Sequence, residues 1–255
     1  MNTRKPQSTE HTGAEKQLTG KIERSRIRLL EIPRLPQAII DGYLALGDAT
    51  CAVSDALDEL GLPGAIAGST LRCIIPGARL VGTALTLRNE ARTDDPATAA
   101  RSKDNRMAEI ECHNLATHGD VLVIQGIQDG SNMGGVGGRL GKRQGELGAI
   151  VDGWVRDVGD FKSIHYPIWS TGVTPMTGKW RLQAVEINGA VVICGVTVNP
   201  GDLVVADDTG VCFVPRARAE EVLAFSRKKN QLEIDMCEKI DKGWSVPEIT
   251  GTVKR

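Results

Sequence analysis

The stretch GAIVDGWVRDVGD, residues 148–160, decides the fold. Its first eight residues are apolar and β-branched enough for a buried strand, yet they lead directly into Arg156, Asp157 and, three residues later, Asp160. Successive strand residues point to opposite faces, so Arg156 and Asp157 serve one site only where the strand stops and the chain turns. Gly159 permits such a turn. The stretch therefore predicts a buried strand that carries polar side chains at its carboxyl end.

The two aspartates have a spacing that suits a small cation. In a helical turn after the strand, Asp157 and Asp160 stand at i and i+3 on one face, close to the positive end of the helix dipole. Mg²⁺ is usually held by one or two protein carboxylates together with substrate oxygens and waters. An Arg–Asp ion pair at a strand end, without a metal, explains the same residues. This stretch alone leaves both interpretations open.

A glycine-rich run, residues 126–138, precedes this strand. Glycines leave room for backbone amides to approach a ligand, and the amides leading into a helix expected at 139–145 form an anion site. Nucleotide patterns do not fit: counted from Gly135, the third glycine of G-x-G-x-x-G falls on Leu140, and Gly141-Lys142 lacks the spacing of a P-loop. A small carboxylate therefore fits this run better than a dinucleotide, with a plain surface loop as the alternative.

Periodicity predicts further elements on both sides. Helical spacing covers residues 35–46, 51–60, 104–116 and 218–241, and strands are expected at 80–87, 120–125, 166–169, 181–187, 190–198, 203–206 and 211–214. Residues 88–92, RNEAR, have the composition of a polar loop that leaves a strand. A strand-rich middle flanked by helices predicts an α/β fold.

A resemblance to a known family adds to this interpretation. Gly135, twenty intervening residues, Arg156-Asp157, two more residues and Asp160 together are similar to the signature of the RraA-like family. Segments 53–61, 77–82, 119–123, 171–175 and 200–207 resemble the family in the same order, so the likeness runs from about residue 26 to 245. The family includes metal-dependent 4-hydroxy-4-methyl-2-oxoglutarate and 4-carboxy-4-hydroxy-2-oxoadipate aldolases, and regulators of ribonuclease E activity. The resemblance implies a layered β/β/α swivelling-domain architecture and a homotrimer or homohexamer.

The resemblance also implies residue roles. The loop at Gly135, the amides of Val136 and Gly137, and Arg156 would bind the pyruvate part of a 2-oxo acid. Asp157 would anchor Mg²⁺ or Mn²⁺ with Asp160 in support, and Arg156 would stabilise the enolate as a catalytic residue beside Asp157. The implied enzyme is a carbon–carbon lyase that performs aldol cleavage, oxaloacetate decarboxylation or both. A non-catalytic protein that inhibits a partner enzyme is the alternative from another class.

One departure from the family pattern lies at Gly135, where aldolase members have an aspartate. We expect its absence to weaken aldol cleavage more than decarboxylation, because only cleavage needs a proton removed from a 4-hydroxyl group. An aspartate introduced at this position is expected to raise cleavage selectively. The base for that proton is not visible in the sequence. Glu233 lies where the family often has a glutamate that reaches a neighbouring subunit, with a solvated helix face as the alternative.

Other reactive residue types are interpreted as structural. Lys142, Lys162 and Lys179 lie in polar surroundings and show no sign of a Schiff-base nucleophile. His165 and the pair Cys112-His113 are more typical of satisfied structural residues than of ligands.

Composition bounds the partners and the compartment. A net charge of −1 from 31 basic and 32 acidic residues gives no broad positive field, so we expect neither nucleic acid nor a membrane as partner. Six cysteines without a C-x-x-C pair, and no apolar run resembling a signal peptide or a span, predict a cytoplasmic protein. Polar residues 1–24 predict a disordered tail, and residues 25–255 a single domain including its C-terminal helix.

Overall fold

A nine-stranded mixed sheet forms the centre of the protein in a computed structural model that describes residues 16–251. Its strand order is β1-β11-β10-β3-β4-β5-β6-β2, and β7 pairs with β3 off this path. The sheet strands are β1 (Ala65–Ala67), β2 (Arg72–Cys73), β3 (Leu80–Ala91), β4 (Asp120–Gln125), β5 (Gly148–Val155), β6 (Ile168–Val173), β7 (Leu182–Ile187), β10 (Leu203–Ala206) and β11 (Gly210–Val214). A separate hairpin joins β8 (Val191–Ile193) to β9 (Val196–Val198).

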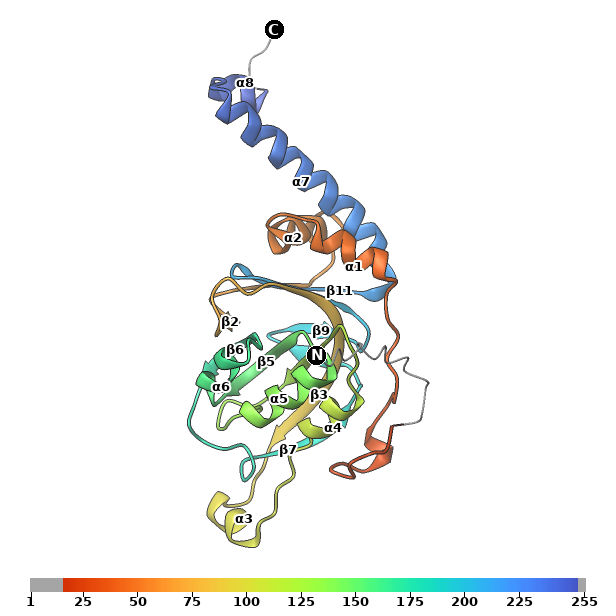
Figure 1. The fold of residues 1–255 in the computed structure, drawn as a ribbon, viewed down its shortest axis with the longest axis vertical. Helices are drawn as coiled ribbons and strands as arrows, with labels where there is room; N and C mark the ends of the chain where they lie inside the picture. Colours follow the sequence, from red (N-terminus) through yellow and green to blue (C-terminus); the bar gives the residue numbers. More distant parts are fainter. Residues whose placement is uncertain (1–15, 252–255) are drawn as a thin grey trace, which may run out of the picture.

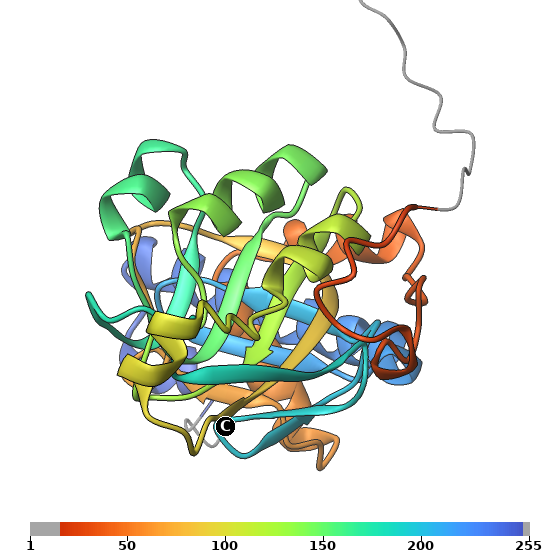
Figure 2. The ribbon, with the colours of Figure 1, turned by 90° about the horizontal axis from the view of Figure 1, so that it is seen from below.

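The helices gather on two sides of this sheet (Figures 1 and 2). Three of them, drawn in greens, form one layer over β4 and β5, whereas the first two and the long C-terminal helix pack near β10 and β11. The helices are α1 (Gln37–Leu44), α2 (Ala49–Glu59), α3 (Pro96–Ser102), α4 (Glu109–Leu115), α5 (Gly135–Gln144), α6 (Val158–Ser163), α7 (Ala219–Asp241) and α8 (Val246–Thr250), with 3₁₀ turns at Arg24–Arg26 and Arg216–Arg218.

The parallel centre of the sheet is buried on both faces. Strands β3, β4, β5 and β6 pair in parallel, and parallel strands covered on both sides have near-continuous apolar sequences such as VLVI in β4. Leu122 and Ile124 face the α4–α6 layer, whereas Val121 and Val123 face the β8–β9 hairpin. The protein thus has a helix layer, a main sheet and a small second sheet, which confirms the layered β/β/α architecture.

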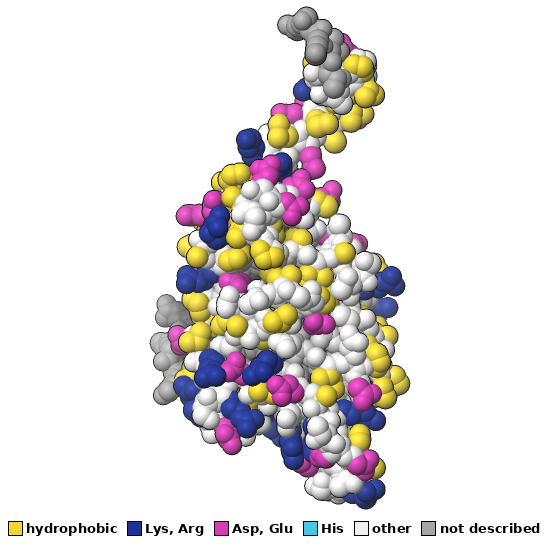
Figure 3. Space-filling view, turned by 180° about the vertical axis from the view of Figure 1, so that it is seen from behind, with side chains coloured by type: hydrophobic (Ala, Val, Ile, Leu, Met, Phe, Trp, Pro, Cys, Tyr) yellow, Lys and Arg dark blue, Asp and Glu magenta, His cyan; other side chains and the backbone are white. Residues whose placement is uncertain are grey.

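The C-terminal helix begins in the core and ends as an arm (Figure 1). Val222 and Leu223, in its first turns, are buried against α1 and α2. Further along, apolar side chains are 43–55% exposed, and Figure 3 shows them on the projecting arm; they are Leu232, Ile234, Met236 and Ile240. No helix within residues 16–251 is long and apolar enough to cross a membrane.

The expected tail is shorter than predicted. Residues 16–24, assigned to a disordered segment, lie along α4, where the amides of Thr19 and Gly20 donate to Oε2 of Glu111 at 2.8 and 3.2 Å. Glu111 is fully buried and needs donors, which this segment supplies to Oε2 while Asn114 of α4 donates to Oε1 at 3.0 Å. Residues 1–15 lie outside the described residues. The single-domain assignment for 25–255 stays a prediction.

Several element boundaries also differ from expectation; helix α4 begins at Glu109 rather than at 104, and strand β6 covers Ile168–Val173 rather than 166–169. Strand β3 continues to Ala91 through the expected loop, because Asn89 and its neighbours pair with β7. Residues 190–198 form a hairpin rather than one strand, turning at Cys194-Gly195 with positive φ angles of 46° and 90°. Helix α5 begins at Gly135, four residues before the expected start at 139.

Candidate functional site

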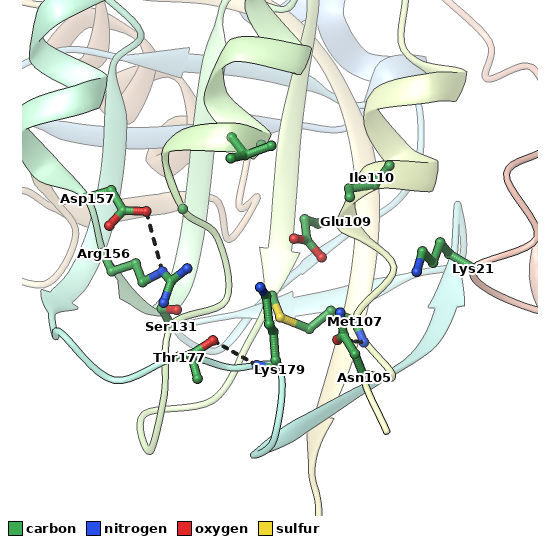
Figure 4. Close-up of a pocket in the computed structure, with 13 residues that line it drawn as sticks. Lys21, Asn105, Met107, Glu109, Ile110, Ser131, Arg156, Asp157, Thr177 and Lys179 are labelled. Carbon is green, nitrogen blue, oxygen red and sulfur yellow. Dashed lines mark hydrogen bonds and ion pairs between the residues drawn. The ribbon is translucent and has the colours of Figure 1, made fainter. Parts of the chain in front are cut away.

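A cleft of about 220 Å³ opens beside the carboxyl end of β5 (Figure 4). Five segments far apart in the sequence line it: the N-terminal segment, the start of α4, the start of α5, the end of β5 and the loop before β7. Of the predicted site residues, Val136, Gly137, Arg156 and Asp157 lie in this lining. The volume is below the roughly 300 Å³ at which pockets for drug-sized ligands begin, so the cleft suits a small molecule.

Asp157 joins the strand end to the start of α5. Its backbone is left-handed, with φ of 61°, a conformation that aspartate adopts more readily than most residues. The chain therefore turns at Asp157 itself and not at Gly159, the turn residue predicted from sequence. Oδ2 of Asp157 accepts a hydrogen bond from the Gly135 amide at 3.0 Å and lies 3.4 Å from Nε of Arg156.

The start of α5 approaches this turn too closely for side chains. A Cβ atom on Gly134 would lie 2.8 Å from Oδ2 of Asp157, and one on Gly135 would lie 2.8 Å from Cβ of Asp160. The first amides of a helix have no acceptor within it, and those of Val136 and Gly137 have none elsewhere among residues 16–251. Both residues line the cleft, so their donors could accommodate a bound carboxylate.

Of the two aspartates expected to share a cation, Asp157 lines the cleft and Asp160 does not. Oδ1 of Asp160 lies 3.1 Å from Nη2 of Arg139, and its carboxylate lies against Gly135 at the start of α5. No cluster of three or more Asp, Glu, His or Cys residues suited to a metal occurs within residues 16–251. Asp157 alone, half-exposed and with no partner on Oδ1 among residues 16–251, still fits a Mg²⁺ or Mn²⁺ ion that takes its other oxygens from substrate and water.

Sequence reasoning missed three charged residues of the lining. Lys21 belongs to the segment predicted as a disordered tail, Lys179 was considered only as a Schiff-base nucleophile, and Glu109 carried no motif. Burial raises the pKa of the Glu109 carboxyl above its usual range, and the positive charges of Lys179 and Lys21 act in the opposite direction. No local sequence pattern marked any of the three, because they meet only when distant segments converge on the cleft.

Known proteins resemble this chain over most of its length. Residues 50–213, more than half of the chain, match the RraA-like family, described as Aldolase/RraA. The chain belongs to the RraA-like family. Among RraA-like solved structures, Streptomyces coelicolor RraAS2, described as an unusual member of the RNase ES inhibitor RraA protein family, is 28% identical with a TM-score of 0.67. The match covers 80% of this chain and 97% of RraAS2, which confirms the predicted fold.

Two curated relatives have a similar level of sequence identity with this chain. A Halalkalibacterium halodurans protein named "Putative 4-hydroxy-4-methyl-2-oxoglutarate aldolase" is 32% identical over 182 residues, covering 71% of this RraA-like chain and 79% of the relative. Protein DlpA of Legionella pneumophila is 31% identical over 171 residues, which is 67% of this chain and 27% of DlpA. This chain therefore spans about a quarter of the length of DlpA.

A buried polar network lies under α5 in this RraA-like chain. Nδ1 of His113 lies 2.9 Å from Oε1 of Glu146, and the Tyr166 hydroxyl donates to Oε2 of Glu146 at 2.5 Å. Burial, together with the Glu146 carboxylate, raises the pKa of Tyr166. A Cβ atom on Gly137 would lie 3.0 Å from Nε2 of His113, so the network supports the helix that carries the cleft amides.

The remaining predicted candidates lie away from the cleft. Glu233 is exposed on the arm of α7, which does not border the cleft in its own chain. His165 is exposed and has a left-handed backbone, with φ of 49°. Neither residue lines the cleft that a single chain forms.

Proposed function

We propose that this RraA-like chain is a divalent-metal-dependent lyase that forms the enolate of pyruvate from a 2-oxo acid. Oxaloacetate decarboxylation is its stronger reaction and cleavage of a 4-hydroxy-2-oxo acid the weaker one. The observation that carries the proposal is the convergence of Arg156, Asp157 and the free amides of Val136 and Gly137 in one small cleft. The name of the Halalkalibacterium relative supports the same reaction class.

The cleft residues supply what enolate chemistry requires. The amides of Val136 and Gly137 line the cleft at a helix start and would bind the substrate carboxylate. The Arg156 guanidinium stays charged at any working pH and stabilises negative charge that develops on the 2-oxo oxygen. A Mg²⁺ or Mn²⁺ ion held by Asp157 would add positive charge beside that oxygen. Preorganised charge of this kind replaces the Schiff base of other aldolases.

The test is pyruvate release from oxaloacetate and from a panel of 4-hydroxy-2-oxo acids, with Mg²⁺ or Mn²⁺ and with chelator. The rate with metal alone is subtracted, because oxaloacetate also decarboxylates without enzyme. We expect Arg156→Ala to lower turnover by at least about 10²-fold, the usual effect of removing a preorganised donor. Asp157→Asn should lose the metal dependence while the fold survives, because asparagine also tolerates the left-handed backbone.

Arg139→Ala serves as the matched control. Arg139 is an arginine of α5 that is 55% exposed and lies outside the cleft lining, so its removal should leave turnover near the wild-type rate. Wild-type rates in the Arg156→Ala variant would show that the site is elsewhere.

A non-catalytic inhibitor of a partner enzyme is the second candidate. The exposed apolar side chains of the α7 arm and the likeness to RraAS2 favour it. No metal-dependent pyruvate release from any substrate, together with binding of a partner that survives Arg156→Ala, would select this function over the lyase.

A further inference from the structure

Glu109 is a carboxylate of the cleft to which the proposed reaction has so far given no role. It is the first residue of α4, and its side chain extends into the space between Arg156 and Lys21 (Figure 4). Among the described residues that line the cleft, the carboxylates are Asp157 and Glu109. No side chain within residues 16–251 forms an ion pair with Glu109 or donates a hydrogen bond to it.

The neighbouring carboxylates all have structural partners. Glu111 accepts the Thr19 and Gly20 amides, and Glu146 accepts the Tyr166 hydroxyl. Asp160 pairs with Arg139 outside the cleft. Glu109 is only partly buried at the cleft wall and receives no side-chain donor among residues 16–251, so its carboxylate is available to a bound substrate.

The groups that face Glu109 suit a proton carrier. Lys21 comes from the N-terminal segment, Lys179 from the loop before β7, Arg156 from the end of β5, and His113 stands one turn further along α4. Burial raises the pKa of Glu109, while a hydrogen bond from its own backbone amide and the nearby His113, Lys179 and Lys21 act in the opposite direction. A raised carboxyl pKa suits a group that both takes and returns a proton.

We propose that Glu109 is the acid–base residue of this cleft, an inference that rests on the proposed lyase function. In cleavage, the Glu109 carboxylate takes the proton of the substrate 4-hydroxyl. The C3–C4 bond then breaks, its electron pair forms the C2–C3 double bond of the pyruvate enolate, and the C4 fragment leaves as a carbonyl compound. Protonated Glu109 returns its proton to C3, which yields pyruvate and restores the carboxylate.

The other polar groups of the lining are less suited to this role. Lys21, Lys179 and Arg156 carry positive charge and hold no lone pair for a proton. Asp157 already accepts the Gly135 amide and is the proposed metal anchor. Ser131 and Thr177 have hydroxyl groups that need a base themselves. Glu109 also supplies a carboxylate to a site that lacks the aldolase aspartate at position 135.

The experiment compares two reactions that share the enolate but differ in their need for a base. Exchange of the pyruvate methyl protons in D₂O, followed by ¹H NMR, requires a base, whereas oxaloacetate reaches the enolate by losing CO₂. We expect Glu109→Gln to slow exchange by at least about 10²-fold, the lower end of general-base effects, and to remove the rise of the exchange rate with pH. Decarboxylation should stay near the wild-type rate, as should affinity for oxalate, an enolate mimic measured by calorimetry.

Two variants accompany this measurement. Glu90→Gln removes a half-exposed carboxylate outside the cleft lining and should leave both reactions unchanged. Glu109→Ala repeats the test should the glutamine variant fold poorly. Wild-type exchange in the Glu109 variants, or decarboxylation by a wild-type protein that shows no exchange, would overturn the inference alone. Equal loss of exchange, decarboxylation and oxalate affinity would also overturn it by showing a structural role. Absence of both reactions in the wild type would overturn the lyase function itself.

Discussion

The contact between Gly135 and Asp160 predicts a measurable coupling between α5 and α6. A Cβ atom at Gly135 would lie 2.8 Å from Cβ of Asp160 and 2.9 Å from its Cγ, with Oδ2 closer still. Ordinary carbon–carbon contact needs about 3.5 Å, so Gly135→Ala forces the two helices apart by roughly 0.7 Å. Overpacking of this size costs about 1–3 kcal/mol, whereas alanine in place of helical glycine gains about 1 kcal/mol.

The cost of overpacking and the gain from replacing a helical glycine can be measured separately in variants that differ at Asp160. With Asp160 present, Gly135→Ala should lower the free energy of unfolding by up to about 2 kcal/mol. Asp160→Ala removes the Cγ and Oδ2 contacts but keeps the Cβ contact, so the effect should shrink. Asp160→Gly removes all of them, and Gly135→Ala should then stabilise the protein by up to about 1 kcal/mol.

Urea unfolding followed by tryptophan fluorescence, at one fixed protein concentration, measures each variant. The double-mutant cycle cancels the loss of the Arg139–Asp160 ion pair, because that loss occurs in both members of each pair. A coupling free energy below about 0.5 kcal/mol would refute the packing argument.

The same contact revises what restoring the family aspartate would do. A carboxylate placed at position 135 meets the carboxylate of Asp160, so both sterics and charge oppose it. We therefore expect Gly135→Asp alone to leave aldol cleavage weak, and Gly135→Asp combined with Asp160→Gly to raise it. The sequence-based expectation needs this second substitution.

Three further predictions concern the buried network, pH and assembly. Tyr166→Phe removes a hydrogen bond to a buried carboxylate, worth about 1.5–3 kcal/mol, and should lower the melting temperature by roughly 3–12 °C in calorimetry; an unchanged melting temperature would contradict the network. Because the folded pKa of Glu109 is raised above 4.5, the native state holds this proton longer than the unfolded chain, so wild-type stability should fall relative to Glu109→Gln as pH rises from 4.5 toward the folded pKa; parallel stability curves would count against burial of Glu109. Light scattering should show a trimer or hexamer that Leu232→Glu with Ile240→Glu dissociates, and a stable wild-type monomer at micromolar concentration would contradict the assembly.

The sequence was most informative where one physical pattern dominates. Strand β5 was predicted at its exact bounds because apolar β-branched residues end at a charged cluster, and the parallel strand β4 was predicted from its short apolar run. Arg156 and Asp157 were placed correctly at the strand end, but Asp160 was not brought to the same cleft. Spacing at i and i+3 predicts that two residues share one face of a short helix. It does not predict which cavity that face borders.

The missed residues show where a single sequence loses information. Lys21, Glu109 and Lys179 meet only because the N-terminal segment, α4 and the loop before β7 converge on one cleft, a contact set that no local pattern carries. The early start of α5 was missed because glycine disfavours helices, and tertiary contacts overrode that preference. Arg88 to Ala91 looked like a loop because polar residues on a strand edge have the composition of one.

Helix α5 has a consequence for how this site can be altered or transferred. Four of its ten residues are glycine, which together weaken it by roughly 2–4 kcal/mol relative to an alanine helix. Phe161, His113 and Asp160 fill the space where its side chains would stand. The glycine-rich loop and α5 are thus unable to keep this conformation as an isolated peptide. Grafting them onto another scaffold would transfer the sequence without the binding geometry. A designer would have to transfer the residues that pack against α5 as well, or replace the glycines and redesign the residues that contact them.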